Sequence, residues 1–207
     1  MIDMKTNPNQ LNKTKVAKDR IFHAVMRLMN DNEYDKLSVR NVCQSAGISI
    51  GTFYHYFTSR DDLLTYIIAC GYDEYKKIDE DNKMSQPQRV IDILTYFAAY
   101  LSGFGLSFLS NFLSVKNQAL NVNSILKLNT YNREVVKDLI GYIQQSQDDG
   151  MIESVYSVRK IYDELNAIFY GNVFNWCLSG GDYELMETVR KMLTAHFNLY
   201  LKAEYRI

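Results

Sequence analysis

Apolar residues recur at helical spacing from about Thr14, and they predict a first helix that ends near the polar run 30–32. Steps of three and four residues place one apolar stripe on this helix: Ile21, Phe22, Val25, Leu28 and Met29. The asparagines at its end favour side-chain to backbone hydrogen bonds over further helix. Residues 1–12 are rich in Asn, Lys and Gln and contain Pro8, so we expect a disordered tail there.

Two short helices joined by a tight turn are predicted over residues 38–57. Ser38 and Ser49 suit the N-caps of the two helices, and Gly47 suits a left-handed C-terminal conformation. An apolar set would hold the pair together and onto the first helix: Val39, Val42, Ala46, Ile48, Phe53 and Phe57. A turn of this length sets two helices roughly at right angles, and in a helix-turn-helix the second one enters the major groove of DNA.

The rest of the pattern predicts further helices and no convincing strand. Ser59 and Asp62 resemble a capping box at the start of a helix from about Arg60 to Lys83. Gly71 inside this helix is a possible bending point. A linker follows, and later helices are expected over about 88–102, 106–119, 126–148, 158–178 and 183–203. The chain therefore reads as an all-α protein.

Composition agrees with a helical protein, since 207 residues contain only 2 prolines and 10 glycines. The chain lacks an apolar run long enough to span a membrane and lacks an apolar signal core, so we expect a cytoplasmic protein with no membrane partner. Cys43, Cys70 and Cys177 are far apart and odd in number. They are expected to be buried thiols, and we expect no metal and no cofactor.

Charge is divided unevenly along the chain. Residues 1–60 hold nine Lys or Arg and five Asp or Glu, a net of +4. Residues 61–207 hold the remaining 14 basic and 19 acidic residues, a net of −5. A basic first section on an acidic remainder suits a nucleic-acid-binding head on a body that avoids DNA.

The second helix of the pair is expected to present polar side chains outward. These candidates are Ser49, Thr52, Tyr54, His55 and Tyr56. Hydroxyl groups and an imidazole can bond phosphate oxygens and base edges, and Gly51 would allow close approach of the backbone. Arg40 and Arg60 can reach phosphates from either side of this helix, and Arg40 can also reach a base.

This segment resembles the TetR family of bacterial regulators over about residues 15–65. The matching stretches are Ser38–Val42, Ala46–Ser49, Gly51–Phe57 and Asp62–Leu64. Arg60 stands where the family usually has Lys, which keeps the charge. Ile50 is apolar where some relatives carry a polar, base-reading side chain, so only a contact to a thymine methyl is expected there.

The resemblance implies roles for the outward residues. Thr52, Tyr54, Tyr56 and Arg60 would hold phosphates, while Arg40 and His55 would read bases. The alternative is that the two tyrosines only pack at the junction of the surrounding helices. The resemblance also implies three parts: a tail over 1–12, a helix-turn-helix DNA-binding domain over 13–60, and a helical effector-binding and dimerisation domain over 61–207.

The last two helices are the candidates for a dimer interface, as in the family. The first carries a broad apolar face: Ile161, Leu165, Ile168, Phe169, Val173, Trp176 and Cys177. The second carries another: Met186, Val189, Leu193, Phe197, Tyr200 and Leu201. The alternative is that both faces belong to the internal core. A homodimer would place two recognition helices on a near-palindromic operator.

Aromatic residues between the fourth and the later helices make an effector pocket a second expectation. The candidates are Tyr100, Phe104, Phe108, Tyr131 and Tyr170, although aromatic residues at helical spacing more often belong to the core than to a pocket. They favour a small, largely apolar or aromatic effector. In the family mechanism the effector tilts the fourth helix and weakens DNA binding.

The sequence therefore predicts a dimeric, sequence-specific transcriptional regulator, most simply a repressor. Phosphate loops, metal motifs and nucleophile elbows are absent from it, so we do not expect an enzyme. An activator or a DNA-organising protein without an effector is the alternative, and so is an interaction module that lost DNA binding.

Overall fold

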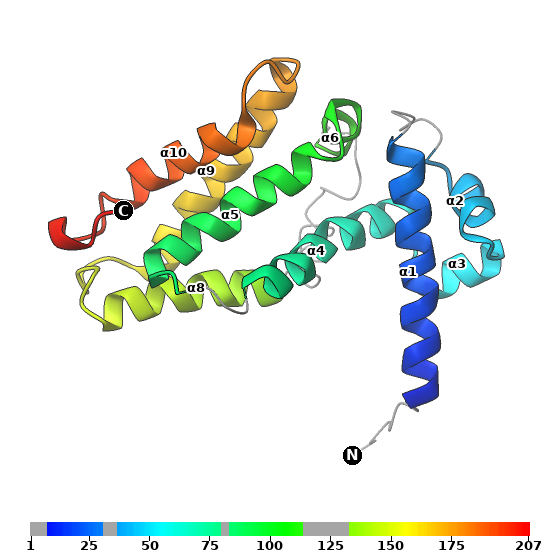
Figure 1. The fold of residues 1–207 in the computed structure, drawn as a ribbon, viewed down its shortest axis with the longest axis horizontal. Coiled ribbons are helices and arrows are strands. Elements are labelled where there is room, and N and C mark those ends of the chain that lie inside the picture. Colours follow the sequence, from blue (N-terminus) through cyan, green and yellow to red (C-terminus); the bar gives the residue numbers. More distant parts are fainter. Residues whose placement is uncertain (1–7, 31–36, 80–82, 114–132) are drawn as a thin grey trace. The chain divides into compact units, whose positions relative to one another are not determined.

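The computed structural model of this chain describes residues 8–30, 37–79, 83–113 and 133–207 (Figure 1). Within these ranges the regular structure is helical, which confirms the all-α prediction. The α-helices are α1 Pro8–Asn30, α2 Val39–Ala46, α3 Ile50–Tyr56, α4 Arg60–Asp79, α5 Gln86–Ser102, α6 Leu106–Phe112, α8 Arg133–Asp148, α9 Val158–Leu178 and α10 Leu185–Phe197. None of the described helices is long and apolar enough to cross a membrane.

The chain divides into two compact units, which we call the head (residues 1–67) and the body (residues 68–207). The expected boundary lay earlier, between residues 60 and 61. The difference arises because the first two turns of α4 belong to the head, where Leu63, Leu64 and Ile67 are buried. One continuous helix, α4, is thus shared by both units.

Helix α1 begins at Pro8, so residues 8–12 are helical although the sequence suggested a tail there. Proline is compatible with the first position of a helix, because the N–H that it lacks would have no partner within the helix. Further along, α1 buries Ile21, Ala24, Val25 and Met29, which are spaced three and four residues apart. Ile21, Val25 and Met29 of the predicted stripe therefore face the core of the head, whereas Phe22 and Leu28 are only partly buried.

In the body, α5 is the central helix. It packs against α10 and α8, and it also contacts α9 (Figure 1). Its start is fixed by Gln88, whose side-chain oxygen accepts a hydrogen bond from the backbone of Ser85 at 3.2 Å. Apolar side chains on several sides of α5 are buried: Val90, Ile91, Ile93, Leu94, Phe97, Ala98 and Leu101. A helix buried on this many sides needs neighbours around it, and α8, α9 and α10 supply them.

The C-terminal helices match the prediction at α9 and depart from it at α10. The sequence suggested a helix to residue 203, but α10 ends at Phe197. The chain then turns back, so that Leu201 forms an isolated antiparallel bridge with Ile152. Asn198 holds this turn, because its side chain exchanges two hydrogen bonds with the backbone of Ile207 at 2.8 and 3.0 Å. Two other predicted helices, over 106–119 and 126–148, lie partly outside the described residues.

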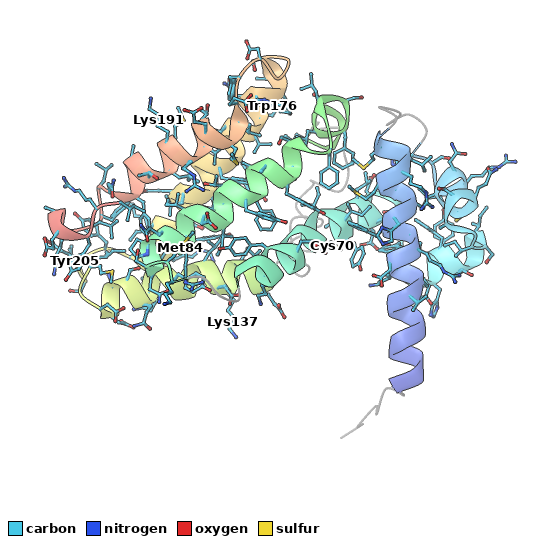
Figure 2. All side chains as sticks on the ribbon, in the orientation of Figure 1. Cys70, Met84, Lys137, Trp176, Lys191 and Tyr205 are labelled. Atoms are coloured by element: carbon cyan, nitrogen blue, oxygen red, sulfur yellow. The ribbon has the colours of Figure 1, made fainter. Side chains whose placement is uncertain are left out.

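At the other end of α10, an indole closes the turn from α9 (Figure 2). Trp176 Nε1 donates a hydrogen bond to the carbonyl of Tyr183 at 2.9 Å. Gly181 has a φ of 76°, and a Cβ there would lie 3.1 Å from the indole ring. The turn therefore needs glycine, and the indole fixes how α9 and α10 meet.

Candidate nucleic-acid interface

The turn between α2 and α3 is built by the caps that the sequence predicted. Ser38 Oγ accepts a hydrogen bond from the backbone of Asn41, which caps the start of α2. Gly47 ends α2 with φ 64° and ψ 39°, and the next residue, Ile48, donates to the carbonyl of Cys43 at 3.0 Å. This is the hydrogen-bond pattern of a Schellman motif, and it favours glycine at its left-handed position.

Helix α3 starts immediately after this turn. Ser49 Oγ accepts a hydrogen bond from the backbone of Thr52 at 3.0 Å, as expected of an N-cap. The hydroxyl groups of Ser49 and Thr52 also lie 2.8 Å apart. Both side chains are thereby held in place on the same turn of the helix.

The inner face of α3 is aromatic and buried. Phe53 and Phe57 are buried, and their ring centroids lie 5.6 Å apart. Phe57 continues the contact to Tyr66 on α4 at 5.3 Å, and Lys18 Nζ lies 4.7 Å from the centroid of that ring. Residues of α1 and α4 therefore pack around the inner face of α3 and hold it in place.

The opposite face of α3 is exposed. At 3.6 residues per turn, Gly51 and His55 lie on the side away from Phe53, and both are exposed. Tyr54 flanks them and is 54% exposed, although its ring edge meets Phe53. Tyr56 on the other flank is partly buried, and its ring lies 4.9 Å from that of His55.

Of the remaining predicted residues, Ser49 is exposed and Thr52 is partly buried. Arg40 is exposed on α2. Arg60 stands at the start of α4, where its Nε lies 3.5 Å from an oxygen of Asp61, and its side chain is about two-fifths exposed. The head thus gathers the predicted set on α2, at the N-cap of α3, on α3 itself and at the first residue of α4.

Two contacts and one exposed side chain of the head were not anticipated from the sequence. Arg27 on α1 donates hydrogen bonds to the carbonyl and the hydroxyl of Ser45 at 2.8 and 3.3 Å, and so ties α1 to the last turn of α2. Gln44 is exposed one turn after Arg40, a spacing that could have suggested it. At the start of α4, Ser59 Oγ accepts from the backbone of Asp62 at 3.0 Å, as the predicted capping box requires, and the Asp62 side chain also accepts from the backbone and hydroxyl of Thr58.

The exposed polar side chains of the head differ in chemistry from its buried thiol. Cys43 is buried, and burial raises the pKa of its thiol, which therefore stays protonated near neutral pH. Among the described residues there is no group of three or more His, Cys, Asp or Glu side chains placed to hold a metal ion. What the exposed face offers is hydroxyl, imidazole and guanidinium groups on a rigid helix, which suit phosphates and base edges.

In the body, three of the predicted pocket residues lie in one aromatic row. Tyr100 meets Phe104 at 4.9 Å between ring centroids, and Phe104 meets Phe108 at 5.1 Å. Tyr170 lies on α9, is 44% exposed and contacts Phe169. Tyr131 lies outside the described residues.

The apolar faces predicted for dimerisation turn out to be largely core. On α9 and α10 these buried members are Ile161, Leu165, Phe169, Val173, Val189, Leu193 and Phe197, and Leu201 beyond α10 is buried too. They are buried because α5, α6 and α8 pack on that side of the pair. The internal alternative holds for them, and the outward surface of the pair has a different composition.

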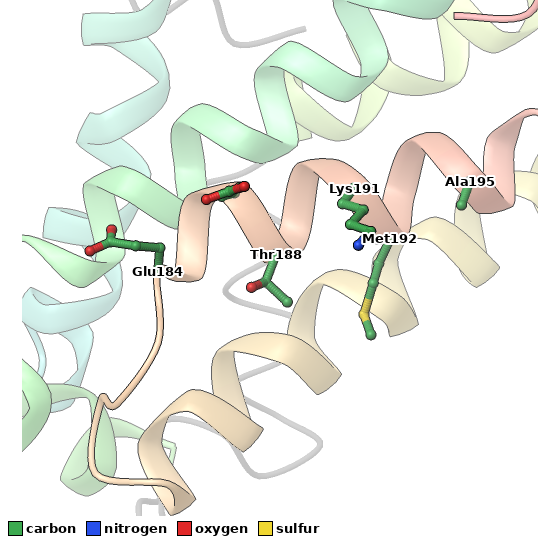
Figure 3. A pocket seen from close by; sticks show the side chains of 6 residues that line it. Glu184, Thr188, Lys191, Met192 and Ala195 are labelled. Carbon is green, nitrogen blue, oxygen red and sulfur yellow. The ribbon is translucent and has the colours of Figure 1, made fainter.

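That outward surface carries two stripes with spacings of four, three and four residues. We call them together the α9–α10 stripes: Ala167, Gly171, Phe174 and Leu178, with Thr188, Met192, Ala195 and Leu199. An open groove of about 560 Å³ runs along α10, where Thr188, Met192 and Ala195 line it with Glu184, Glu187 and Lys191 (Figure 3). Phe174 is 48% exposed, which is unusual for so large an apolar side chain.

A model of the family described as "Bacterial regulatory proteins, tetR family" matches residues 21–67. The uncharacterized HTH-type transcriptional regulator YwcC of Bacillus subtilis is 37% identical over 65 residues. That match covers 31% of this chain and 29% of the relative. The chain therefore spans less than a third of this relative's length, and the match to the family model lies within the head.

Two comparisons extend over the body. The fatty acid metabolism regulator protein of Bacillus subtilis is 20% identical over 178 residues, which cover 84% of this chain and 90% of the relative. The solved structure of the regulator FadR from Bacillus subtilis in complex with stearoyl-CoA has a TM-score of 0.66 and 19% identity. It covers 86% of this chain and 96% of that chain, and it shows a shared fold.

Proposed function

We propose that this chain is a sequence-specific, DNA-binding transcriptional regulator of the TetR type, since the model of that family of bacterial regulatory proteins matches its head over residues 21–67. The observation that carries the proposal is the two-sided character of α3. One face is locked into the head by Phe53 and Phe57, and the opposite face leaves Gly51 and His55 exposed. A short helix held in this way suits insertion into the major groove.

The proposed contacts divide into positioning and base recognition. Thr52, Tyr54, Tyr56 and Arg60 hold phosphates, which fixes the orientation of α3 on the duplex. His55 lies at the middle of the exposed face and reads a base edge. Arg40 on α2 reads a base or a phosphate beside it.

We further propose that the regulator acts as a homodimer on a near-palindromic operator. One recognition helix contacts only about four to five base pairs, so two are needed for useful specificity. The α9–α10 stripes are the proposed interface, because they expose apolar side chains on two helices already packed together. A second copy also suits the charges beside the groove, since Lys191 of each copy can pair with Glu184 or Glu187 of the other across a two-fold axis.

The proposed signal is a largely apolar effector that enters the body and lowers operator affinity, so that the protein acts as a repressor. The aromatic row at Tyr100, Phe104 and Phe108 supplies apolar area with a polar hydroxyl group. The structural relative bound to stearoyl-CoA makes long-chain acyl-CoA thioesters the first class to test. Linkage requires that operator DNA weaken effector binding by the same factor.

Selection of duplexes from random sequence by the full-length protein tests the DNA-binding proposal. We expect a near-palindromic site, with affinity that falls steeply as salt rises. His55→Ala should relax the preference at one position of each half-site, by about 1–3 kcal/mol. His23→Ala is the matched control, because His23 is an exposed histidine of the head on α1 rather than α3.

Selection without an enriched site would contradict sequence-specific binding and favour an interaction module. An enriched site with equal loss in both histidine variants would contradict the assignment of α3. Stearoyl-CoA should then release the protein from the selected site in a gel shift, with coenzyme A as the control. Retention at saturating stearoyl-CoA would reject this class of effector and favour a regulator with another ligand or with none.

A further inference from the structure

Gly71 on α4 and Tyr100 on α5 make an unusually close contact. A Cβ atom added at Gly71 would lie 2.6 Å from both Cδ1 and Cε1 of Tyr100, and 3.0 Å from its Cγ. Ring atoms near the stem of a side chain cannot move away without rotating the whole ring. The ring of Tyr100 therefore rests on the backbone of α4, at a place where only glycine fits.

Other helical glycines of the body show that this is not a general property of the fold. Gly141 in α8 and Gly171 in α9 have no heavy atom within 4 Å of an added Cβ. Glycine within a helix is unfavourable for the helix itself, so a packing reason is expected where it is buried. The sequence suggested a bending point at Gly71, whereas the structure gives it a role in packing.

Tyr100 connects this contact to the interior of the body. Its ring stacks near Tyr96, with centroids 6.4 Å apart and planes at 15°, and meets Phe104 edge to face at 4.9 Å. Burial, with smaller contributions from Cys70 and Tyr96, raises the pKa of Tyr100. The hydroxyl therefore remains neutral, and the ring belongs to the aromatic row that the proposed effector would meet.

Helix α4 is also the element that head and body share. Residues 60–67 belong to the head and residues 68–79 to the body. Within the body, α4 is held near its end by Lys76, whose Nζ lies 3.2 Å from Glu134 and 3.4 Å from Asp138 on α8. The contact with Tyr100 lies nearer the head, so it acts on the part of α4 that leads directly to the DNA-binding unit.

We propose that Tyr100 is the positioning residue through which the interior of the body controls the position of α4. Its ring acts on α4 at Gly71, against which it packs. This inference rests on the proposed function, because α4 position matters only if the head binds DNA under control of the body. An apolar chain that enters the aromatic row turns the Tyr100 ring, and the ring moves the backbone on which it rests. Closely packed contacts of this kind transmit a displacement because they cannot compress.

Gly71→Ala tests the proposal without any effector, since the added methyl group forces the ring of Tyr100 to move. We expect operator affinity to fall about tenfold, the usual size of an allosteric effect. Gly141→Ala is the matched control and should leave operator affinity unchanged. A second change, Tyr100→Leu, removes the ring and should restore binding to Gly71→Ala, whereas Tyr100→Phe keeps the ring and should not.

Thermal unfolding and hydrogen exchange distinguish positioning from loss of fold. We expect Gly71→Ala to unfold at nearly the wild-type temperature, with faster amide exchange confined to residues 68–79 and reversed by Tyr100→Leu. This readout needs no DNA, so it decides the inference even if the wild-type protein binds no operator. The inference would be overturned if amide exchange in α4 of Gly71→Ala stayed at the wild-type rate, or if Gly71→Ala kept wild-type operator affinity. It would also be overturned if Tyr100→Phe restored the affinity of Gly71→Ala as well as Tyr100→Leu does.

Discussion

The head and the body bury their aromatic residues in different ways. In the head, Phe53 on α3 and Phe57, the C-cap residue of α3, are four residues apart and pack on each other. In the body, an aromatic contact joins two separate helices, since Tyr75 on α4 meets Tyr96 on α5 with ring centroids 5.3 Å apart. The aromatic pair of the head therefore depends on short-range spacing, whereas this aromatic pair of the body depends on the packing of two helices.

Phe53→Ala is the change with the largest expected effect, and it tests whether the head depends on one buried anchor. Phe53 is fully buried, so its loss should cost about 3–5 kcal/mol of the head's free energy of unfolding. Operator binding should disappear with the fold of α3. A denaturant titration, followed by one spectroscopic probe in the head and another in the body, measures the free energy of unfolding of each unit.

The control for this change is Phe174→Ala, because Phe174 is an equally large side chain that is 48% exposed within one chain. It should leave the head's unfolding midpoint unchanged. A loss below about 1 kcal/mol in Phe53→Ala, the range of a surface change, would show that the head does not depend on this anchor.

Phe174→Asp is the second prediction, and it addresses the surface by which the body is proposed to meet its copy. A charge in the middle of an apolar interface leaves an unpaired, desolvated carboxylate, so the dimer should weaken by about 2 kcal/mol or more. Sedimentation at several concentrations measures the dissociation constant. Operator affinity should fall with it, because each recognition helix then binds alone.

Val155→Asp is the control, since Val155 is 77% exposed but lies outside the α9–α10 stripes. An unchanged dissociation constant in Phe174→Asp, or an equal rise in Val155→Asp, would exclude the stripes as the interface. The two outcomes differ from a folding defect, which far-UV circular dichroism would detect in the same samples.

Features that depend on neighbouring residues could be predicted from the sequence. Ser38, Gly47 and Ser49 define α2 and α3 through hydrogen bonds that span five residues or fewer, and the structure confirms each of these caps. The bounds of α9 were likewise predicted, and the structure adds Ser157 as its N-cap. A helix end can be predicted from the sequence where the hydrogen-bond partner of the capping residue lies within one or two helical turns of it.

Features that depend on distant residues could not be predicted. Periodicity marks an apolar face on α9 and α10, but it cannot say whether α5 or a second chain covers that face. The hydrogen bonds of Arg27 to Ser45 join residues that are 18 positions apart, and no local sequence pattern predicts them. Gly71 read as a flexible point because the ring of Tyr100, which needs that space, comes from another helix.

The third prediction compares two glycines of the head that differ in backbone conformation. Gly47 has a φ of 64°, so Gly47→Ala should cost about 1–2 kcal/mol of the head's stability. Gly51 lies within α3, where an added Cβ meets only Ser49 Oγ at 3.8 Å. Gly51→Ala should therefore raise stability by about 0.5–1 kcal/mol while lowering operator affinity, because the methyl group points toward the DNA.

Thermal unfolding and a gel shift on the same samples separate the two effects. Lower affinity in Gly47→Ala should follow from its lower stability and recover on cooling. Lower affinity in Gly51→Ala should persist at every temperature. Wild-type affinity in Gly51→Ala would show that the backbone of α3 does not approach the DNA closely.

The smallest expected effect concerns a cluster that joins α9 to α10. A carboxylate oxygen of Glu164 accepts hydrogen bonds from the Tyr200 hydroxyl and from His196 Nε2, the latter at 2.8 Å, and Lys160 Nζ lies 3.8 Å from the other oxygen. These bonds, that from Tyr200 first, lower the pKa of Glu164 below its ordinary value of 4.5. Burial and the adjoining carboxylate raise the pKa of Tyr200 to about 12.

Because the folded state favours the ionised form of Glu164, the stabilisation is complete above pH 4.5 and is lost as the pH falls through the lowered pKa. The Glu164 side chain is 32% exposed, so solvent screening limits the contribution to less than about 1 kcal/mol. Glu164→Gln should therefore flatten the fall in the free energy of unfolding between about pH 5 and pH 3, whereas Glu187→Gln on the surface of α10 should not. An unchanged slope in Glu164→Gln would mean that the acid sensitivity of the body arises elsewhere, and that this contact between two helices is as dispensable as an ordinary surface ion pair.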